Sequence, residues 1–447
     1  MAFTVDGKKV TVVGAARSGV AAALLLVERG ARVTLTDVRP VLPPVTSMPL
    51  LSEETVDARL RRAGVTLELG EHHTDTFNHA DLIVLSPGVP LDQPHVAAAR
   101  RNGVPVIGEL ELASRWLRGR IVAITGTKGK STTTTLTGRM FTAGGLTAMV
   151  GGNIGTPLSS QVAQSTPDTF HIVEVSSFQL ETADTFHPWI AVLLNFSPDH
   201  LDRHASLAEY ASAKARIFAN QNENDWAVIN ADDPQTLALA RGIRARKVYF
   251  SGATALVPRS SIHLIGKHLV ADVMAAATVA EIAGVPRDAM VSAVESFTGL
   301  EHALEPVATI RGVRFVNDSK ATNVEAAQRA IESFDHGLVV IMGGRFKGGD
   351  FALLREPLRA QGATVIAIGE ARPLIEAAFD GVVPVHAATT LTGAVQRGYV
   401  LAQPDGTVLL SPACASFDMF RDYAERGLAF KQAVKELAEK TNTTREQ

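Results

Sequence analysis

The stretch Ile124-Thr-Gly-Thr-Lys-Gly-Lys-Ser-Thr132 decides the fold class, because it carries an apolar strand through a short glycine loop into a helix. Backbone N–H groups at the start of such a helix point at phosphate oxygens, and the helix dipole favours negative charge there. The ammonium group of Lys130 can contact the β- and γ-phosphates, and the Ser131 hydroxyl can bind Mg²⁺. The loop is shorter than a standard P-loop, and a purely structural turn is the alternative. Strand, Gly-Lys-Ser and helix in this order favour a nucleoside triphosphate site.

Outside this stretch, short apolar runs alternate with longer Ala-rich stretches of helical character. Apolar strands are expected at 9–13, 32–36, 121–124 and 313–316, and helices at 207–220 and 272–283. This alternation is typical of α/β units around parallel sheets. The 447 residues correspond to roughly three domains of about 150 residues each. We expect these domains at 1–108, 109–298 and 299–447.

The composition excludes several classes of protein. With 46% hydrophobic and 20% charged residues, the chain can bury large cores and is not disordered. Its net charge of −3 lacks the basic excess of a nucleic-acid or anionic-membrane binder. The single Cys414 excludes an intrachain disulfide and a cysteine-built metal centre. The longest apolar run, 20–27, is too short for a membrane span of about 20 residues. Residues 1–9 lack the apolar region of a signal peptide, so we expect a soluble, cytoplasmic protein.

A second glycine loop, Gly14-Ala-Ala-Arg-Ser-Gly19, follows the first strand. It is similar to a dinucleotide fingerprint, and Asp37 follows about twenty residues later, where such folds place a ribose-binding acid. The middle glycine that lets the backbone approach a pyrophosphate is missing. A site for a nucleotide-like group and a structural turn therefore both stay open. If the loop binds a nucleotide, Asp37 and Arg39 are expected to contact its ribose, base or phosphate.

Three polar residues near the central strands are candidates for metal chemistry. Glu174 interrupts the apolar strand 171–175, so it is either paired in the interior or a metal ligand at the strand end. His200 lies between Asp199 and Asp202 after another strand. A lone histidine is more often structural, but the neighbouring acids and the predicted phosphate site favour a functional role. Lys214 has the helical spacing of a solvated lysine.

In the last third of the chain, each apolar strand ends in a loop of small or polar residues. Lys320, Thr322, Lys347 and Ser416 all follow such strands. Ligands bind outside the carboxyl ends of parallel strands. Each residue alone is an ordinary loop residue, but as a set they predict a site for a carboxylate or a phosphate.

Taken together, these residues resemble the Mur ligase family of peptidoglycan synthesis, over nearly the whole chain. The last two of the following motifs are specific to the member that adds D-glutamate. The motifs are Gly126-Thr-Lys-Gly-Lys-Ser-Thr132, Gly151-Gly-Asn-Ile-Gly155, Glu174-Val-Ser-Ser-Phe-Gln-Leu-Glu181, Asp199-His-Leu-Asp-Arg203, Asn230-Ala-Asp-Asp233, Asn317-Asp-Ser-Lys-Ala-Thr-Asn323 and Ser411-Pro-Ala-Cys-Ala-Ser416.

The resemblance implies an α/β protein with a Rossmann-like N-terminal domain for UDP, a central P-loop-type ATPase domain and a Rossmann-like C-terminal domain for an amino acid. It implies ATP and Mg²⁺ as cofactors, and UDP-N-acetylmuramoyl-L-alanine and D-glutamate as substrates. ATP would phosphorylate the alanine carboxylate, and the amine of D-glutamate would attack the acyl phosphate. We expect a monomer whose third domain swings toward the second when ligands bind.

The resemblance also implies roles for individual residues. The catalytic set would be Lys130, Glu174, His200, Lys214 and Lys320. ATP would be bound by Gly126, Thr127, Lys128, Gly129, Lys130, Ser131, Thr132, Asp272 and Asp318. The UDP-linked substrate would contact Arg17, Ser18, Asp37, Arg39, Ser86 and Asn153. D-Glutamate would contact Thr322, Lys347, Ser416, Phe417 and Tyr423. A first Mg²⁺ would be held at the phosphates by Ser131, and a second by Glu174 and His200. Lys214 would be carbamylated by CO₂, which turns a cation into an oxygen ligand for a metal.

Two positions depart from the family pattern. The family has His-Arg at the hinge into the third domain, where this chain has His302-Ala303. It has His-Asn-x-x-Asn before a central helix, where this chain has His268-Leu-Val-Ala-Asp272. Two alternatives stay open. A folylpolyglutamate synthase-like ligase shares the central domain but does not need a leading UDP domain. A nucleotide-binding module without catalysis is favoured by the two departures.

Overall fold

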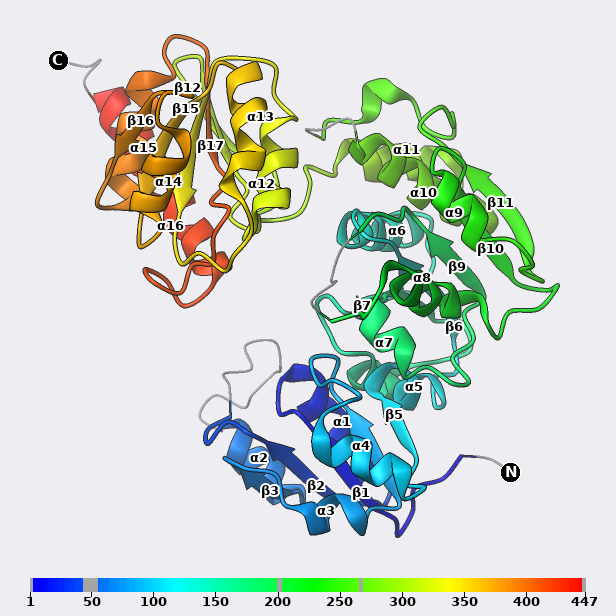
Figure 1. The fold of residues 1–447 in the computed structure, drawn as a ribbon. Coiled ribbons are helices and arrows are strands. Elements are labelled where there is room, and N and C mark those ends of the chain that lie inside the picture. The colour runs from blue at the N-terminus through cyan, green and yellow to red at the C-terminus, as the bar shows by residue number, and fades with distance from the viewer. Residues whose placement is uncertain (1–2, 43–54, 199–202, 265–267, 444–447) are drawn as a thin grey trace. The chain divides into compact units, whose positions relative to one another are not determined.

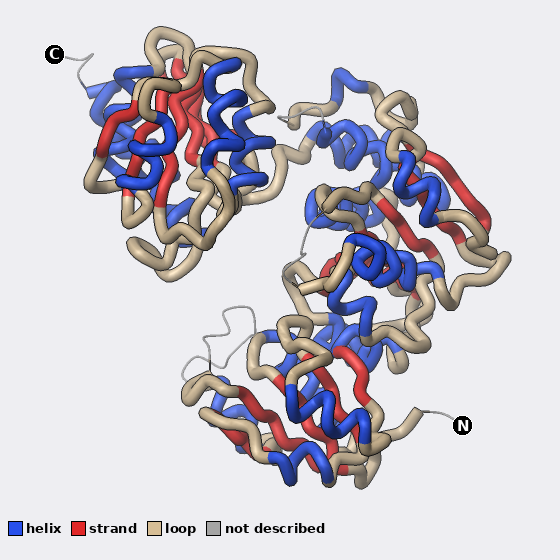
Figure 2. Tube along the Cα trace, viewed as in Figure 1, coloured by secondary structure: helices blue, strands red, loops and turns tan. Residues whose placement is uncertain are grey.

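The computed structural model describes residues 3–42, 55–198, 203–264 and 268–443. Three sheets organise the chain, each built mainly from parallel strands with helices beside them (Figures 1 and 2). The contacts within the chain divide it into two compact units. Unit 1 comprises Met1–Ile262 with Ala271–Val294, and unit 2 comprises His263–Val270 with Glu295–Gln447. Among the described residues, no helix combines the length and the apolarity that crossing a membrane requires.

The first sheet of unit 1 has the order β3-β2-β1-β4-β5, with all neighbours parallel. Val12 and Val84 of the sheet are fully buried and pack in one core with Leu26 of the first helix. The connection reverses direction between β1 and β4, which leaves a crevice at their carboxyl ends. The elements are β1 (Lys9–Val13), α1 (Arg17–Glu28), β2 (Arg32–Asp37), α2 (Val56–Arg62), β3 (Thr66–Leu69), α3 (Thr74–Asn78), β4 (Leu82–Leu85), α4 (Pro94–Arg101), β5 (Val106–Gly108) and α5 (Glu109–Ser114).

The second sheet of unit 1 has the order β11-β10-β9-β6-β8-β7 and is also parallel throughout. Its strands are β6 (Arg120–Thr125), β7 (Ala148–Gly152), β8 (Phe170–Glu174), β9 (Ile190–Leu193), β10 (Trp226–Asn230) and β11 (Arg246–Phe250). Its α-helices are α6 (Lys130–Ala143), α7 (Ser177–Glu181), α8 (Leu207–Ala215), α9 (Pro234–Leu239), α10 (His268–Ile282) and α11 (Arg287–Glu295). Short 3₁₀ helices are η1 (Leu158–Gln164), η2 (Arg216–Phe218) and η3 (Arg259–Ser261).

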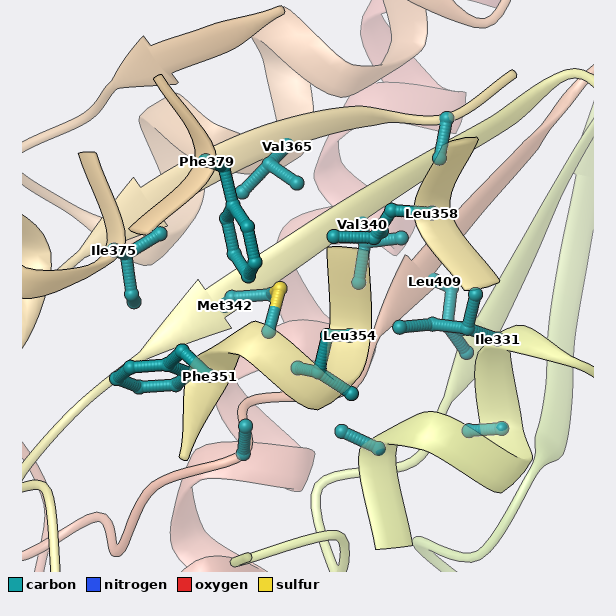
Figure 3. Close-up of a cluster of buried hydrophobic side chains, with 14 of the residues drawn as sticks. Ile331, Val340, Met342, Phe351, Leu354, Leu358, Val365, Ile375, Phe379 and Leu409 are labelled. Carbon is teal, nitrogen blue, oxygen red and sulfur yellow. The ribbon is translucent and has the colours of Figure 1, made fainter. Parts of the chain in front are cut away.

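Unit 2 holds the third sheet, with the order β12-β13-β17-β14-β15-β16. Apolar clusters lie on it, and Figure 3 shows one in which Phe351 and Phe379 pack near Met342. The strands are β12 (Glu305–Ile310), β13 (Val313–Asn317), β14 (Leu338–Gly343), β15 (Thr364–Ile368), β16 (Val385–Ala387) and β17 (Thr407–Leu410). The helices are α12 (Val324–Ile331), η4 (Phe351–Leu354), α13 (Arg355–Ala360), α14 (Arg372–Phe379), α15 (Leu391–Leu401) and α16 (Tyr423–Thr443).

The predicted α/β class with parallel Rossmann-like sheets is confirmed. Strand β1 has the predicted bounds, and β13 ends one residue later than predicted. The helix predicted at 207–220 is wrong at its end, because α8 ends at Ala215 and the 3₁₀ helix η2 follows. Strand β12 was not predicted, and it pairs antiparallel to β13 at the sheet edge. The three domain boundaries stay a prediction.

Candidate active site

The glycine loop predicted to bind phosphate joins β6 to α6. Gly129 lies at the start of α6 with a φ of 80°, in the left-handed region that favours glycine. A Cβ atom there would lie 2.1 Å from Oδ1 of Asp272, so the close approach also requires glycine. No side chain caps this helix start. The predicted ATP residues 126–132 therefore form one continuous loop and first helical turn, whose backbone geometry suits an anion.

Two predicted lysines meet at the same carbonyl of this loop. Nζ of Lys130 donates to the carbonyl oxygens of Gly126 and Thr127, at 3.0 and 2.9 Å. Nζ of Lys214 donates to the Gly126 oxygen at 2.8 Å and lies 4.6 Å from the ring centroid of Tyr210. Only 1% of Lys214 is exposed, so the interpretation of its spacing as a solvated lysine is wrong. Lysine is almost never buried to this extent unless its ammonium group has a partner, and here the Gly126 carbonyl is one.

The loop is also held from the neighbouring strand. The backbone N–H of Lys128 donates to the side-chain oxygen of Asn195 at 2.8 Å, and the Asn195 amide donates back to the Lys128 carbonyl at 3.0 Å. The hydroxyls of Thr127 and Tyr210 lie 3.3 Å apart. These contacts fix the loop backbone over the carboxyl ends of β6 and β9.

Glu174 lies at the end of β8 and joins two predicted sites. The hydroxyl of Ser131 donates to its Oε2 at 2.7 Å, and the amide of Asn153 donates to its Oε1 at 2.9 Å. Glu174 is 2% exposed, so the carboxylate is buried but paired at both oxygens. Carboxylate and hydroxyl oxygens are ligands that suit Mg²⁺. The described residues contain no cluster of three or more His, Cys, Asp or Glu that could hold a metal. His200 lies outside the described residues, so its place beside Glu174 stays a prediction.

Asp272 of α10 lies against the phosphate loop, as its predicted role requires. Burial raises the pKa of its carboxyl from the ordinary 3.8 to about 7, although the charge of Lys130 acts in the opposite direction. Its Oδ2 atom is buried and bonded to no other residue of the described chain. An orphaned buried carboxyl oxygen is costly. A carboxyl group with a raised pKa therefore lies against the loop from α10.

A cavity of about 570 Å³ opens at the crevice of the first sheet. All six residues predicted to bind the UDP-linked substrate line it: Arg17, Ser18, Asp37, Arg39, Ser86 and Asn153. The guanidinium of Arg17 donates to the carbonyl of Gly155 at 3.3 Å, which joins α1 to the loop after β7. The cavity thus reaches from the N-terminal sheet to Asn153, the residue bonded to Glu174.

Asp37 is fixed as an anion in this cavity. Partial burial would raise its pKa, but the hydrogen bonds from Arg39 and from the Ala15 N–H outweigh burial and lower the pKa to about 2. Arg39 binds both carboxylate oxygens, at 2.9 and 2.6 Å. The acid at the end of β2 thus orients an arginine that remains about half exposed, with 47% of its side chain accessible.

Sequence reasoning missed two polar residues of this cavity, His72 and Gln93. His72 follows the end of β3, and Gln93 caps α4 by accepting from the Val96 N–H at 2.9 Å. A search for polar residues just after each strand of the first sheet would have found His72.

The loops predicted to bind D-glutamate all belong to unit 2. Lys320 and Thr322 follow β13, Lys347 follows β14, and Ser416 and Phe417 follow β17. Nζ of Lys347 lies 5.7 Å from the ring centroid of Phe417, and Tyr423 begins α16. The buried guanidinium of Arg426 bonds to the Ser319 hydroxyl, the Ser319 carbonyl and the Cys414 carbonyl. This arginine joins the loop after β13 to the loop after β17. The predicted loop residues therefore lie at the carboxyl ends of the strands of this sheet.

Asp318 and Ala303 lie in the same unit. Asp318 is buried, accepts from the Leu304 N–H at 3.2 Å and from the Ser411 hydroxyl at 3.1 Å, and its pKa is raised by burial to about 7. Its ATP-binding role stays a prediction. Ala303, where the family has an arginine, pairs through its backbone with Leu300.

Three domain families match the sequence: a Mur ligase MurD-like N-terminal domain at 8–108, a Mur ligase middle domain at 124–257 and a Mur ligase glutamate ligase domain at 304–414. Two similar curated proteins are both named UDP-N-acetylmuramoylalanine–D-glutamate ligase. That of Koribacter versatilis is 43% identical over 97% of this chain and 99% of its own length. That of Acidobacterium capsulatum is 44% identical over 96% of each.

Two solved structures have a fold similar to that of this chain. A UDP-N-acetylmuramate–alanine ligase from Thermotoga maritima has a TM-score of 0.58 at 18% identity, covering 96% of this chain and 99% of that one. A pseudomurein peptide ligase type C from Methanothermus fervidus has a TM-score of 0.56 at 17% identity, covering 96% and 100%. At these identities the likeness concerns the fold alone.

Proposed function

The chain belongs to the Mur ligase family, and from that premise we propose that it is an ATP-dependent ligase that joins D-glutamate to UDP-N-acetylmuramoyl-L-alanine in peptidoglycan precursor synthesis. One observation carries the proposal. Glu174 accepts from Ser131 of the phosphate loop and from Asn153 of the UDP-site cavity. A single carboxylate therefore links the place for ATP to the place for the nucleotide sugar, as phosphoryl transfer between the two requires.

The chemistry explains why cations surround the loop. A carboxylate is a poor electrophile, so ATP first converts the alanine carboxylate to an acyl phosphate and releases ADP. The amine of D-glutamate then attacks the acyl carbon, and the tetrahedral adduct collapses to amide and phosphate. Negative charge accumulates at both steps, and Lys130 of the phosphate loop would offset part of it.

A metal ion fits the oxygen atoms at this site. Ser131 and Glu174 would hold Mg²⁺, with His200 as a further predicted ligand, and the bound ion would offset phosphate charge. We propose that Lys214 reacts with CO₂ through its neutral amine, forming an N–C bond and releasing one proton. The carbamate nitrogen would keep an N–H for the Gly126 carbonyl, and its new oxygens would be available as metal ligands.

We assign the amino acid to unit 2. Lys347 would pair with the side-chain carboxylate of D-glutamate, beside Thr322, Ser416, Phe417 and Tyr423. Lys320 would offset charge on the reacting phosphate. We further place the enzyme in the cytoplasm, where its nucleotide substrates are made, and propose that it acts as a monomer.

A phosphate-release assay tests the proposed function. UDP-N-acetylmuramoyl-L-alanine, ATP and Mg²⁺ are combined in turn with D-Glu, L-Glu, L-Ala and L-Lys. We expect rapid release only with D-Glu, and none when the UDP-linked substrate is omitted. Nucleotide binding without turnover under all conditions would instead support a non-catalytic module, which the departures at Ala303 and Leu269 favour. Turnover on a folate substrate without UDP would support the folylpolyglutamate-type alternative, but the large cavity of the first sheet argues against it.

A further inference from the structure

One wall of the cavity has no role in the function proposed above. His72 lines this wall with Val38 and Gln93. Its Nδ1 atom lies 2.8 Å from the hydroxyl of Thr36, which is fully buried in β2. The ring also packs edge-on against Phe77, with centroids 5.5 Å apart, so a hydrogen bond and an aromatic contact both restrict its orientation.

The second ring nitrogen of His72 remains available. Within the described ranges, only Nδ1 of this residue has a hydrogen-bond partner in the protein. Burial, together with the nearby His95, lowers the pKa of His72, so its ring is neutral near pH 7. We assign to His72 the tautomer in which the Thr36 hydroxyl donates to Nδ1, because the proton of the neutral ring then lies on Nε2, the nitrogen that faces no partner among the described residues. His72 then presents one N–H donor of fixed orientation.

Three other polar groups of the cavity already have partners within the protein. Asp37 is bonded to Arg39 and to the Ala15 N–H, and the Ser86 hydroxyl donates to the Gly14 carbonyl at 2.7 Å. Asn153 donates to Glu174. These contacts shape the cavity, but they leave fewer groups to distinguish one ligand from another.

The direction of a nucleotide in this cavity follows from the fold. The start of α1 bears no side-chain cap and carries Arg17 and Ser18, which suits a diphosphate. In folds of this type the nucleoside extends from there over the end of β2. Val38, directly after β2, is 62% exposed although apolar, and it offers a flat contact for a base. The sugar side then points toward Asn153, leaving the base beside His72.

We propose that His72 determines the base specificity of the UDP site, by donating its Nε2 proton to the 4-carbonyl of the uracil that lies on Val38. The inference rests on the proposed function. Uracil presents a carbonyl oxygen where cytosine presents an amino group, so a fixed N–H donor attracts the first and opposes the second.

Titration calorimetry with UDP and CDP tests this role on the full chain. We expect the wild type to prefer UDP. His72→Ala should weaken UDP binding about tenfold while CDP binding changes less, so the ratio of the two affinities falls. His72→Gln should recover part of the preference, because its amide also donates. His73→Ala is the matched control, since His73 is exposed and its ring nitrogen lies 4.0 Å from the exposed carboxylate of Glu71.

The outcomes separate this inference from the proposed function. An unchanged ratio of UDP to CDP affinity in His72→Ala would overturn the inference. If both affinities fell by the same factor, the ratio would also be unchanged, and His72 would be a packing residue. If His72→Ala fails to fold, Thr36→Val replaces it, because loss of the hydroxyl frees the ring and should also lower the ratio. A preference retained in Thr36→Val would then count against the inference. A wild type that binds no UDP would contradict the proposed function itself.

Discussion

At the scale of the residue, Asp272 gives the phosphate loop a pH-dependent stability. Its pKa rises from 3.8 to about 7 on folding, mainly through burial. Between these values the folded protein holds a proton that the unfolded chain has released, so the contribution to stability falls as pH rises toward 7 and stays low above it. Asp272→Asn removes this titration at nearly constant shape.

We therefore expect the stability of Asp272→Asn relative to wild type to increase with pH. One pKa unit corresponds to about 1.4 kcal/mol, so the relative gain between about pH 4 and pH 8 is on the order of a few kcal/mol. Urea midpoints at several pH values measure it. Asp318→Asn should change in the same direction, because burial also raises the pKa of Asp318 to about 7. A difference independent of pH would show that Asp272 stays ionised.

Also at this scale, Lys214 allows a test of the carbamate. Lys214→Ala should lower turnover by about 100-fold or more, because an oxygen ligand and the contact to the Gly126 carbonyl are both lost. Added acetate or propionate should restore part of the rate by supplying a carboxylate. The wild type with the same acids is the control and should not accelerate. Full activity in the untreated variant would remove the proposed role.

At the scale of the element, Gly19 sets how closely α1 approaches the loop after β1. A Cβ atom at this position would lie 1.8 Å from the Gly14 carbonyl oxygen and 2.7 Å from the Ser86 hydroxyl. Gly19→Ala must therefore shift the helix, and we expect about 1–3 kcal/mol of destabilisation and weakened UDP binding. Gly88→Ala is the control for stability, because nothing lies within 4 Å of its added Cβ. Equal thermal midpoints for the two variants would contradict the close packing.

The sequence alone predicted some of these elements and site residues and missed others. Local patterns predicted the strand–loop–helix units, since β1, β6 and their glycine loops depend on neighbouring residues. Strand β12 escaped prediction because Pro306 argues against a strand, although an edge position tolerates it. Burial of Lys214 also escaped, because its partner Gly126 is 88 residues away. The motif resemblance predicted six of the residues that line the cavity. It did not include His72, whose position just after β3 was a usable signal but whose contact with Thr36 appears only in the structure.

At the scale of the whole molecule, the proposed roles are divided between the two units. The phosphate loop, Glu174 and the UDP-site cavity belong to unit 1. Lys347, which we assign to the amino acid, and Lys320, which we assign to the reacting phosphate, belong to unit 2. Each unit has its own apolar core. A substitution at a surface lysine of unit 2 should therefore leave the ligand sites of unit 1 intact, so binding and catalysis can be measured separately.

Lys320→Ala makes that separation testable. Lys320 is exposed after β13, and its backbone N–H donates to the His302 carbonyl at 3.0 Å, which the substitution preserves. We expect phosphate release to fall by about 100-fold or more, while affinities for UDP and for a non-hydrolysable ATP analogue change less than about twofold. Lys435→Ala, which removes the same charge from an exposed site on α16, should keep full turnover. Loss of nucleotide affinity in parallel with turnover would instead make Lys320 a ground-state binding residue, because only an interaction confined to the transition state lowers the rate without weakening binding.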